Sequence, residues 1–107
     1  MSKAEKKAVR QKFWDEVIER DDYTCKGCGW RVSPDLAKKH LDVHHIINRH
    51  AIPNGGYVAA NGITLCKLPG GCHEKAEAEA AGFRAADLFA KIGSSPVKAF
   101  AESFLFG

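Results

Sequence analysis

NGITLCKLPGGCHEKAE, residues 61–77, carries two of the four cysteines and joins a short strand to a helix. The apolar and β-branched run at 63–66 predicts a strand, and the KLPGG that follows it predicts a turn. The Ala- and Glu-rich stretch 72–82 predicts a helix that its final glycine ends. Cys66 and Cys72 therefore lie on either side of the turn, and Cys72 falls in the first helical turn.

The other two cysteines form the pair Cys25-x-x-Cys28, which a glycine follows directly. Such a knuckle turns both thiolates toward one ion, and together the two pairs suit a tetrahedral structural Zn²⁺. Disulfides and a redox motif are the alternatives. Disulfides are typical of secreted chains, and the N-terminus lacks the apolar segment of a signal peptide. A redox C-x-x-C opens a helix after a strand, whereas this pair follows a predicted helix.

Upstream, residues 2–20 predict a helix. Ser2 and Glu5 form a capping-box pattern, and an apolar stripe recurs at helical spacing. Lysines and arginines surround this stripe, and they fit a solvated face and a phosphate-facing role equally well. The stripe consists of Val9, Phe13, Trp14, Val17 and Ile18.

Between the cysteine pairs, LDVHHII at 41–47 predicts a strand in which His44 and His45 point to opposite faces. Residues 31–40 before it predict a loop with one helical turn. The stretch 48–62 after it is rich in Asn, Gly and Pro and predicts a long connecting loop.

The tail, residues 83–107, predicts two short helices that cover the core or a partner. Val97, Phe100 and Phe104 recur at helical spacing in the second of them. The chain ends in an apolar Phe-Leu-Phe segment, which we expect to be docked.

The 107 residues suggest one domain, 1–107, with a modest core that a metal would help to stabilise. The formal charge is +3, and the excess lies in the first fifty residues. This charge permits a nucleic-acid partner without requiring one. No run of about 18 apolar residues is present, so we expect no membrane span and a cytoplasmic protein.

His73 and Glu77 lie four positions apart on the predicted helix and share one face. Adjacent helical positions diverge by about 100°, so neither points into a zinc site that Cys72 reaches. A second ion can therefore lie between this helix face and the strand, where His44 or His45 would reach it. The alternative for the doublet is a half-buried strand histidine that is hydrogen-bonded to a neighbour.

Taken together, these motifs resemble the HNH endonuclease family over roughly residues 20–78. The matching segments are RDDYTCKGCG, LDVHHII, NGG, NGITLC and CHEKAE. The resemblance implies an α+β fold: a zinc-stabilised ββα-metal unit, like a treble clef, at about 20–82. The N-terminal helix (about 2–20) and the helical tail lie outside it.

The resemblance also implies roles for single residues. His44 and His73 match metal ligands, and His45 matches the general base. Asn61 matches the middle letter of the motif and would hold the loop and orient the base. Some members carry a further histidine where this chain has Glu77, which either supplies a carboxylate to the ion or leaves two protein ligands. The catalytic ion is then Mg²⁺, Mn²⁺, Ni²⁺ or Zn²⁺.

The implied function is metal-dependent hydrolysis of DNA, as a nick or a double-strand cut, in a bacterial cell or a phage-infected host. The alternative is a zinc-stabilised DNA-binding or partner-docking module without activity, with the tail as the docking segment. We expect little sequence specificity and mostly phosphate contacts, which weaken with salt. The candidate phosphate contacts are Arg49 and His50 first, then Lys26, Arg31, Lys38, Lys39, Lys67 and Lys75.

Overall fold

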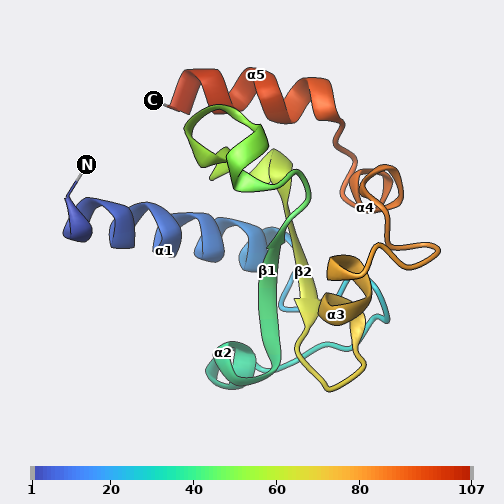
Figure 1. Cartoon of the computed structure of the whole chain (residues 1–107). Coiled ribbons are helices and arrows are strands. Elements are labelled where there is room, and N and C mark those ends of the chain that lie inside the picture. Colours follow the sequence, from blue (N-terminus) through green and yellow to red (C-terminus); the bar gives the residue numbers. More distant parts are fainter. Residues whose placement is uncertain (1, 107) are drawn as a thin grey trace.

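The computed structural model describes residues 2–106 and shows a two-stranded antiparallel sheet surrounded by helices (Figure 1). It confirms the expected small α+β fold with four clustered cysteines. The helices and strands are α1 (Lys3–Arg20), α2 (Ala37–His40), β1 (Leu41–His45), β2 (Gly62–Cys66), α3 (Cys72–Glu77), α4 (Ala85–Lys91) and α5 (Pro96–Phe106). Short 3₁₀ turns are η1 (Pro34–Leu36), η2 (Arg49–Ala51), η3 (Pro53–Gly56) and η4 (Ala59–Asn61).

Helix α1 begins where its capping box predicts. The Glu5 N–H donates to Ser2 Oγ at 3.1 Å, and the Ser2 N–H donates to Glu5 Oε1 at 3.4 Å. The apolar stripe buries Phe13, Val17 and Ile18 against the sheet. These contacts, rather than intrinsic propensity, stabilise the helix and fix its position.

The two strands pair with Leu41 opposite Cys66 and His45 opposite Gly62. Gly62 faces α1 so closely that an added Cβ would lie 2.6 Å from Val17 Cγ2. Opposite residues of an antiparallel pair share a face, so His45 also faces α1. His44 faces the other way, toward α3, where its ring lies 5.4 Å from that of His73. The sheet thus lies between α1 and α3 (Figure 1).

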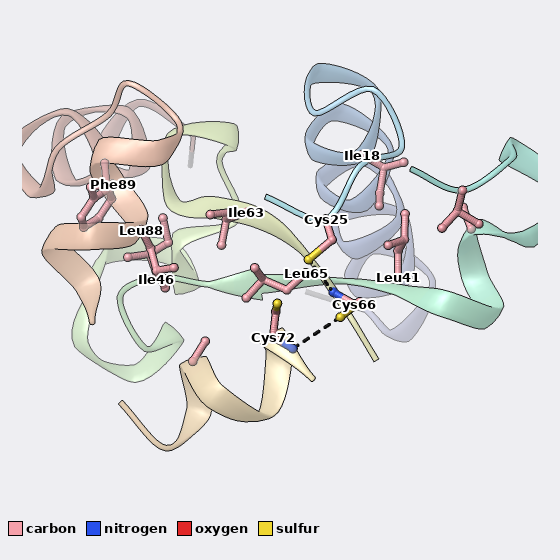
Figure 2. Packing of buried hydrophobic residues seen from close by; sticks show 14 of the residues in the cluster. Ile18, Cys25, Leu41, Ile46, Ile63, Leu65, Cys66, Cys72, Leu88 and Phe89 are labelled. Atoms are coloured by element: carbon pink, nitrogen blue, oxygen red, sulfur yellow. Dashed lines mark hydrogen bonds between the residues drawn. The ribbon is translucent and has the colours of Figure 1, made fainter. Parts of the chain in front are cut away.

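The core gathers around β2 and extends into the tail (Figure 2). Ile63 and Leu65 are fully buried, and Leu88 and Phe89 of α4 pack into the same cluster. Burying each such side chain contributes about 1.5–3 kcal/mol. The tail therefore covers part of the core of this chain, as one of the two expectations for it predicted.

Helix α3 is shorter than predicted, because it stops at Glu77 and not at Gly82. Glu79 has a φ of +52°, and the Ala80 N–H donates to the Lys75 carbonyl at 3.0 Å, which turns the chain sharply. This turn lets Phe83 pack against the core beside Gly27, where an added Cβ would lie 2.9 Å from the ring. Tertiary packing thus ends the helix at Glu77, although the alanines that follow favour a longer one.

Two residues of the apolar C-terminal segment do not dock on this chain, and their docking on a partner stays a prediction. Phe104 and Leu105 are 71% and 86% exposed, and Val97 is 80% exposed. Helix α5 instead packs on η3 and η4, and its fully buried residues there include Ala99 and Ser103. The Asn54 side chain donates to the Ser103 carbonyl across this contact at 2.8 Å.

Residues 2–106 contain no helix that combines the length and the apolar character needed to cross a bilayer.

Candidate functional site

The four cysteine sulfurs lie within 4.8 Å of one another. Cys25 and Cys28 come from the turn after α1, Cys66 ends β2, and Cys72 begins α3. Tetrahedral zinc with bonds of about 2.3 Å places its sulfurs about 3.8 Å apart, so the cluster is close to the required geometry. Among residues 2–106 no other three or more Cys, His, Asp or Glu residues gather as tightly.

Hydrogen bonds to sulfur support this cluster (Figure 2). The Cys66 N–H donates to Cys25 Sγ at 3.3 Å, and the Cys72 N–H donates to Cys66 Sγ at 3.4 Å. Burial acts to raise the pKa of Cys66, but the hydrogen bonds from Cys72 and Cys25 outweigh it and lower that pKa. Burial raises the pKa of Cys25 and of Cys72. Several thiolates at this spacing need a cation among them, and the donor set fits a structural metal.

A second set of possible ligands lies on the other side of β1. His73 Nε2 is 3.2 Å from Glu77 Oε1, and its Nδ1 is 3.6 Å from Asp42 Oδ2. The His44 ring meets the His73 ring edge-on, at an interplanar angle of 71°. Imidazole and carboxylate groups of two elements, β1 and α3, thus converge on one region, and these are donor types that bind divalent ions.

His44, His73 and Glu77 line an open groove of about 540 Å³ between β1, η2 and α3. It brings together six of the residues that the sequence singled out: His44, His45, Arg49, His50, His73 and Glu77. Burial, together with the neighbouring His73, lowers the pKa of His44. A neutral imidazole has a free lone pair, so His44 can bind a metal ion at neutral pH.

His45 lies in an aromatic setting at the end of β1. Its ring centroid is 4.7 Å from that of Phe13 and 4.7 Å from that of Tyr57, which meets it at 89°. Its Nε2 is buried and makes no hydrogen bond within the described residues. Burial, with the charges on His44 and Arg49, lowers the pKa of His45 to about 4. The imidazole is therefore neutral at neutral pH and keeps one ring nitrogen with a free lone pair.

Asn61 is fully buried and holds the chain just beyond the histidines. Its Oδ1 accepts from the Ile47 N–H at 2.9 Å, and its Nδ2 donates to the Ile47 carbonyl at 3.1 Å. The same amide group donates to the Gly56 carbonyl at 3.2 Å. The side chain thus fastens the strand exit to the loop, two residues from His45.

The sequence reasoning missed three residues around the histidines. Asp42 was detectable, because it lies two strand positions before His44 and so shares its face. The contact of Phe13 with His45 follows from α1 packing on the sheet, and only its burial was predictable. Tyr57 lies in an irregular loop, where no periodicity indicates which side chain returns to the strand.

Arg20 and Asp21 were also missed, and they fasten α1 to the strand that follows the loop. Arg20 Nη1 donates to the Ala59 carbonyl at 2.6 Å, and Nη2 donates to the Gly62 carbonyl at 2.7 Å. The buried Asp21 carboxylate binds Arg20 at 2.8 Å and accepts from the Thr64 N–H at 3.0 Å. This pair fixes the base of the sheet relative to α1.

The other candidate phosphate contacts are dispersed. Arg31 pairs with the exposed Asp22 at 3.3 Å, and Lys75 Nζ lies 5.7 Å from the centre of the Phe83 ring. Lys38 and Lys67 line a second groove beside α1, described below. Lys26 and Lys39 line neither groove.

One small α+β fold thus contains four cysteines that could hold a structural metal and a groove lined by histidines. Residues 25–79, just over half of the chain, match the sequence profile of the HNH endonuclease family. The chain belongs to the HNH endonuclease family, and the matched region contains both cysteine pairs and all the groove histidines. Domains of this family are nucleases that act on DNA and use divalent metal ions. Searches of curated proteins and of solved structures gave no match.

Proposed function

We propose that this chain is a metal-dependent DNA endonuclease that hydrolyses phosphodiester bonds in the groove between β1 and α3. The observation that carries the proposal is the meeting of His44, His73 and Glu77 on one side of the strand end and of His45 on the other. A ligand set and a neutral proton acceptor thus border the same groove, and hydrolysis needs both.

His44 and His73 would hold the divalent ion, with Glu77 as the carboxylate ligand. A bound Mg²⁺, Mn²⁺, Ni²⁺ or Zn²⁺ supplies positive charge for a nonbridging phosphate oxygen and the leaving 3′ oxygen. Arg49 and His50 line the same groove and would contact the phosphates that flank the cleaved bond.

His45 would act as the general base and accept the proton of the attacking water. Its neutral state supports this role, since a protonated imidazole has no lone pair to offer. Asn61 would keep His45 in place by fixing Ile47 on the same strand end. The expected products carry 5′-phosphate and 3′-hydroxyl ends.

The four cysteines would hold a structural Zn²⁺ that takes no part in the reaction. Their sulfurs lie within 4.8 Å of one another, and three of the four residues are buried. A closed set of four thiolate ligands leaves no open position for substrate.

The first test is nicking of supercoiled plasmid by the wild type and by His45→Ala, with each of the four divalent ions. We expect His45→Ala to lose activity by at least about 100-fold, because it removes the proton acceptor. His40→Ala is the matched control, since His40 lies outside the groove against Trp30, and we expect it to retain activity.

Two results would contradict the proposal: no nicking by the wild type with any of these ions, or equal nicking by His45→Ala. Either would favour the alternative, a DNA-binding or partner-docking module without catalysis. Three expectations stay predictions: the number of strands cut, the cytoplasmic setting in a bacterial or phage-infected cell, and a protein partner of the tail.

A further inference from the structure

One face of α1 carries a row of basic side chains. Lys3, Lys6, Lys7 and Arg10 recur at three- and four-residue spacing, so they project from the same side of the helix. They line a second groove of about 830 Å³, which Gln11, Trp14, Lys38 and Lys67 complete. Three separate segments thus contribute six cationic side chains to one concave surface.

Carboxylates do not neutralise this surface. Within residues 2–106, the side-chain ion pairs of Lys and Arg involve Lys12, Arg20 and Arg31, and none of the six cations of the groove. Arg10 Nε donates to the Lys6 carbonyl at 3.3 Å, which orders its side chain without cancelling its charge. Six unpaired cations raise a positive potential that favours a polyanion over a single anion.

The length of the row fits an extended chain of phosphates. From Lys3 to Arg10 the helix rises about 10 Å at 1.5 Å per residue. Phosphates of one DNA strand advance about 3.4 Å along the duplex axis, so the row spans about three of them. Partly buried Trp14 adds an apolar surface at the inner end of the row, against which a sugar can pack.

The second groove is distinct from the proposed cleavage groove. The two share no lining residue. The contacts of Gly62 and of His44 place α1 and α3 on opposite faces of the sheet (Figure 1). DNA in contact with the row on α1 is therefore bound by groups that take no part in hydrolysis.

We propose that this second groove binds the sugar–phosphate backbone of duplex DNA and anchors it outside the cleavage groove. The inference goes beyond the proposed cleavage, because the binding uses none of the groove histidines and needs no divalent ion. Its cations would contact phosphates, which carry no sequence information, so the anchor tolerates any sequence.

The test measures DNA binding through a fluorescent residue of the second groove, Trp14. The chain has two tryptophans, so Trp30→Phe leaves Trp14 as the single tryptophan reporter. We titrate this protein with a 20-base-pair duplex in chelator-free buffer without added divalent ions, at several salt concentrations. The expected result is a saturable change in Trp14 fluorescence and an affinity that falls steeply with salt.

The decisive comparison adds two charge-neutralised pairs to the Trp30→Phe background. Lys6→Gln with Arg10→Gln removes two cations from the groove, and we expect the slope of log affinity against log salt to shrink by about two. Lys12→Gln with Lys91→Gln removes two exposed helical cations outside the groove and should leave the slope unchanged. Circular dichroism checks that both variants remain folded.

Equal slopes for the two variants would overturn the proposal. So would a Trp14 response to poly-glutamate together with none to duplex DNA, because that result would identify an acidic protein as the partner. His45→Ala should bind DNA like the wild type. A chain that binds in this way but never cleaves would therefore refute the proposed catalysis and leave this inference intact.

Discussion

At the scale of single residues, Asn61 links the loop to the end of β1 that carries the two histidines. Its amide satisfies both backbone groups of Ile47 and one carbonyl of the glycine turn, with no contact to solvent. A buried amide in such a network cannot be replaced by another side chain of similar size without orphaning backbone groups.

Asn61→Ala should therefore lower the free energy of unfolding by about 3 kcal/mol, because it leaves buried backbone groups of Ile47 and Gly56 unsatisfied. Thermal denaturation measures the effect. Asn48→Ala is the control: it removes one exposed hydrogen bond, to the His50 N–H, and should cost about 0.5–1 kcal/mol. Equal losses in the two variants would show that the buried hydrogen bonds of Asn61 stabilise the fold no more than the exposed one of Asn48.

The histidine doublet shows what a residue pattern can and cannot predict. Strand alternation correctly predicted that His44 and His45 point to opposite faces, but it left open which of them meets α3. The answer depends on the pairing of His45 with Gly62. Because Gly62 has no side chain, α1 can pack closely on the face of the sheet that His45 shares with it. A long-range close approach of this kind leaves no periodic signal in the sequence.

At the scale of elements, α1 is joined to the sheet by apolar packing and by hydrogen bonds from the partly buried ion pair at its end. Arg20 and Asp21 bind three backbone groups between them, in η4 and β2. Since β2 carries Cys66 and pairs with the strand that carries His44 and His45, the position of α1 is coupled to the cysteine cluster and to the histidine groove.

Asp21→Ala should destabilise the protein by about 3 kcal/mol, because it leaves the Thr64 N–H without an acceptor and removes the partner of Arg20. Urea denaturation measures the loss. Asp15→Ala lies on the exposed side of the same helix, bonded only to Gln11, and should change stability by less than about 0.5 kcal/mol. If both variants unfold at the same urea concentration, the contacts of Asp21 with Arg20 and Thr64 do not stabilise the fold.

Element boundaries were predictable wherever a local signal acts alone. The capping box placed the start of α1 correctly, and the β-branched run placed β2 to within a residue. The end of α3 was not predictable, because packing of Phe83 overrides good helix formers. The orientation of α5 was not predictable either. Its small residues Ala99 and Ser103 face the protein, whereas hydrophobicity alone predicts that the larger apolar side chains of the helix do so.

At the scale of the whole molecule, the cysteine cluster connects segments that are far apart in sequence. Cys25 and Cys66 are separated by 41 positions, yet their sulfurs and backbone meet directly. A domain this small buries a limited core, so a metal that closes such a loop contributes a large part of its stability. The composition and cysteine spacing made this feature the most predictable one in the chain.

Cys25→Ser should therefore lose folded structure. His45→Ala should keep it, because His45 is not part of the cysteine cluster. Circular dichroism melting compares the two. Metal analysis by native mass spectrometry should find one zinc that survives mild chelation and a second ion that does not. Matching melting temperatures for the two variants would refute the structural zinc site.

The pairing of β1 with β2 also determines where the chain tolerates insertions. One extra residue between Leu41 and His44 would turn both imidazoles to the wrong faces, because side chains alternate along a strand. Extra residues between Arg49 and Ala59 would also be costly, because Asn54 donates to the Ser103 carbonyl, Asn61 holds the Gly56 carbonyl and Tyr57 packs on His45. Variants with an altered groove are therefore best built by substitution of exposed side chains such as Arg49, without a change in the length of the strand or of the loop.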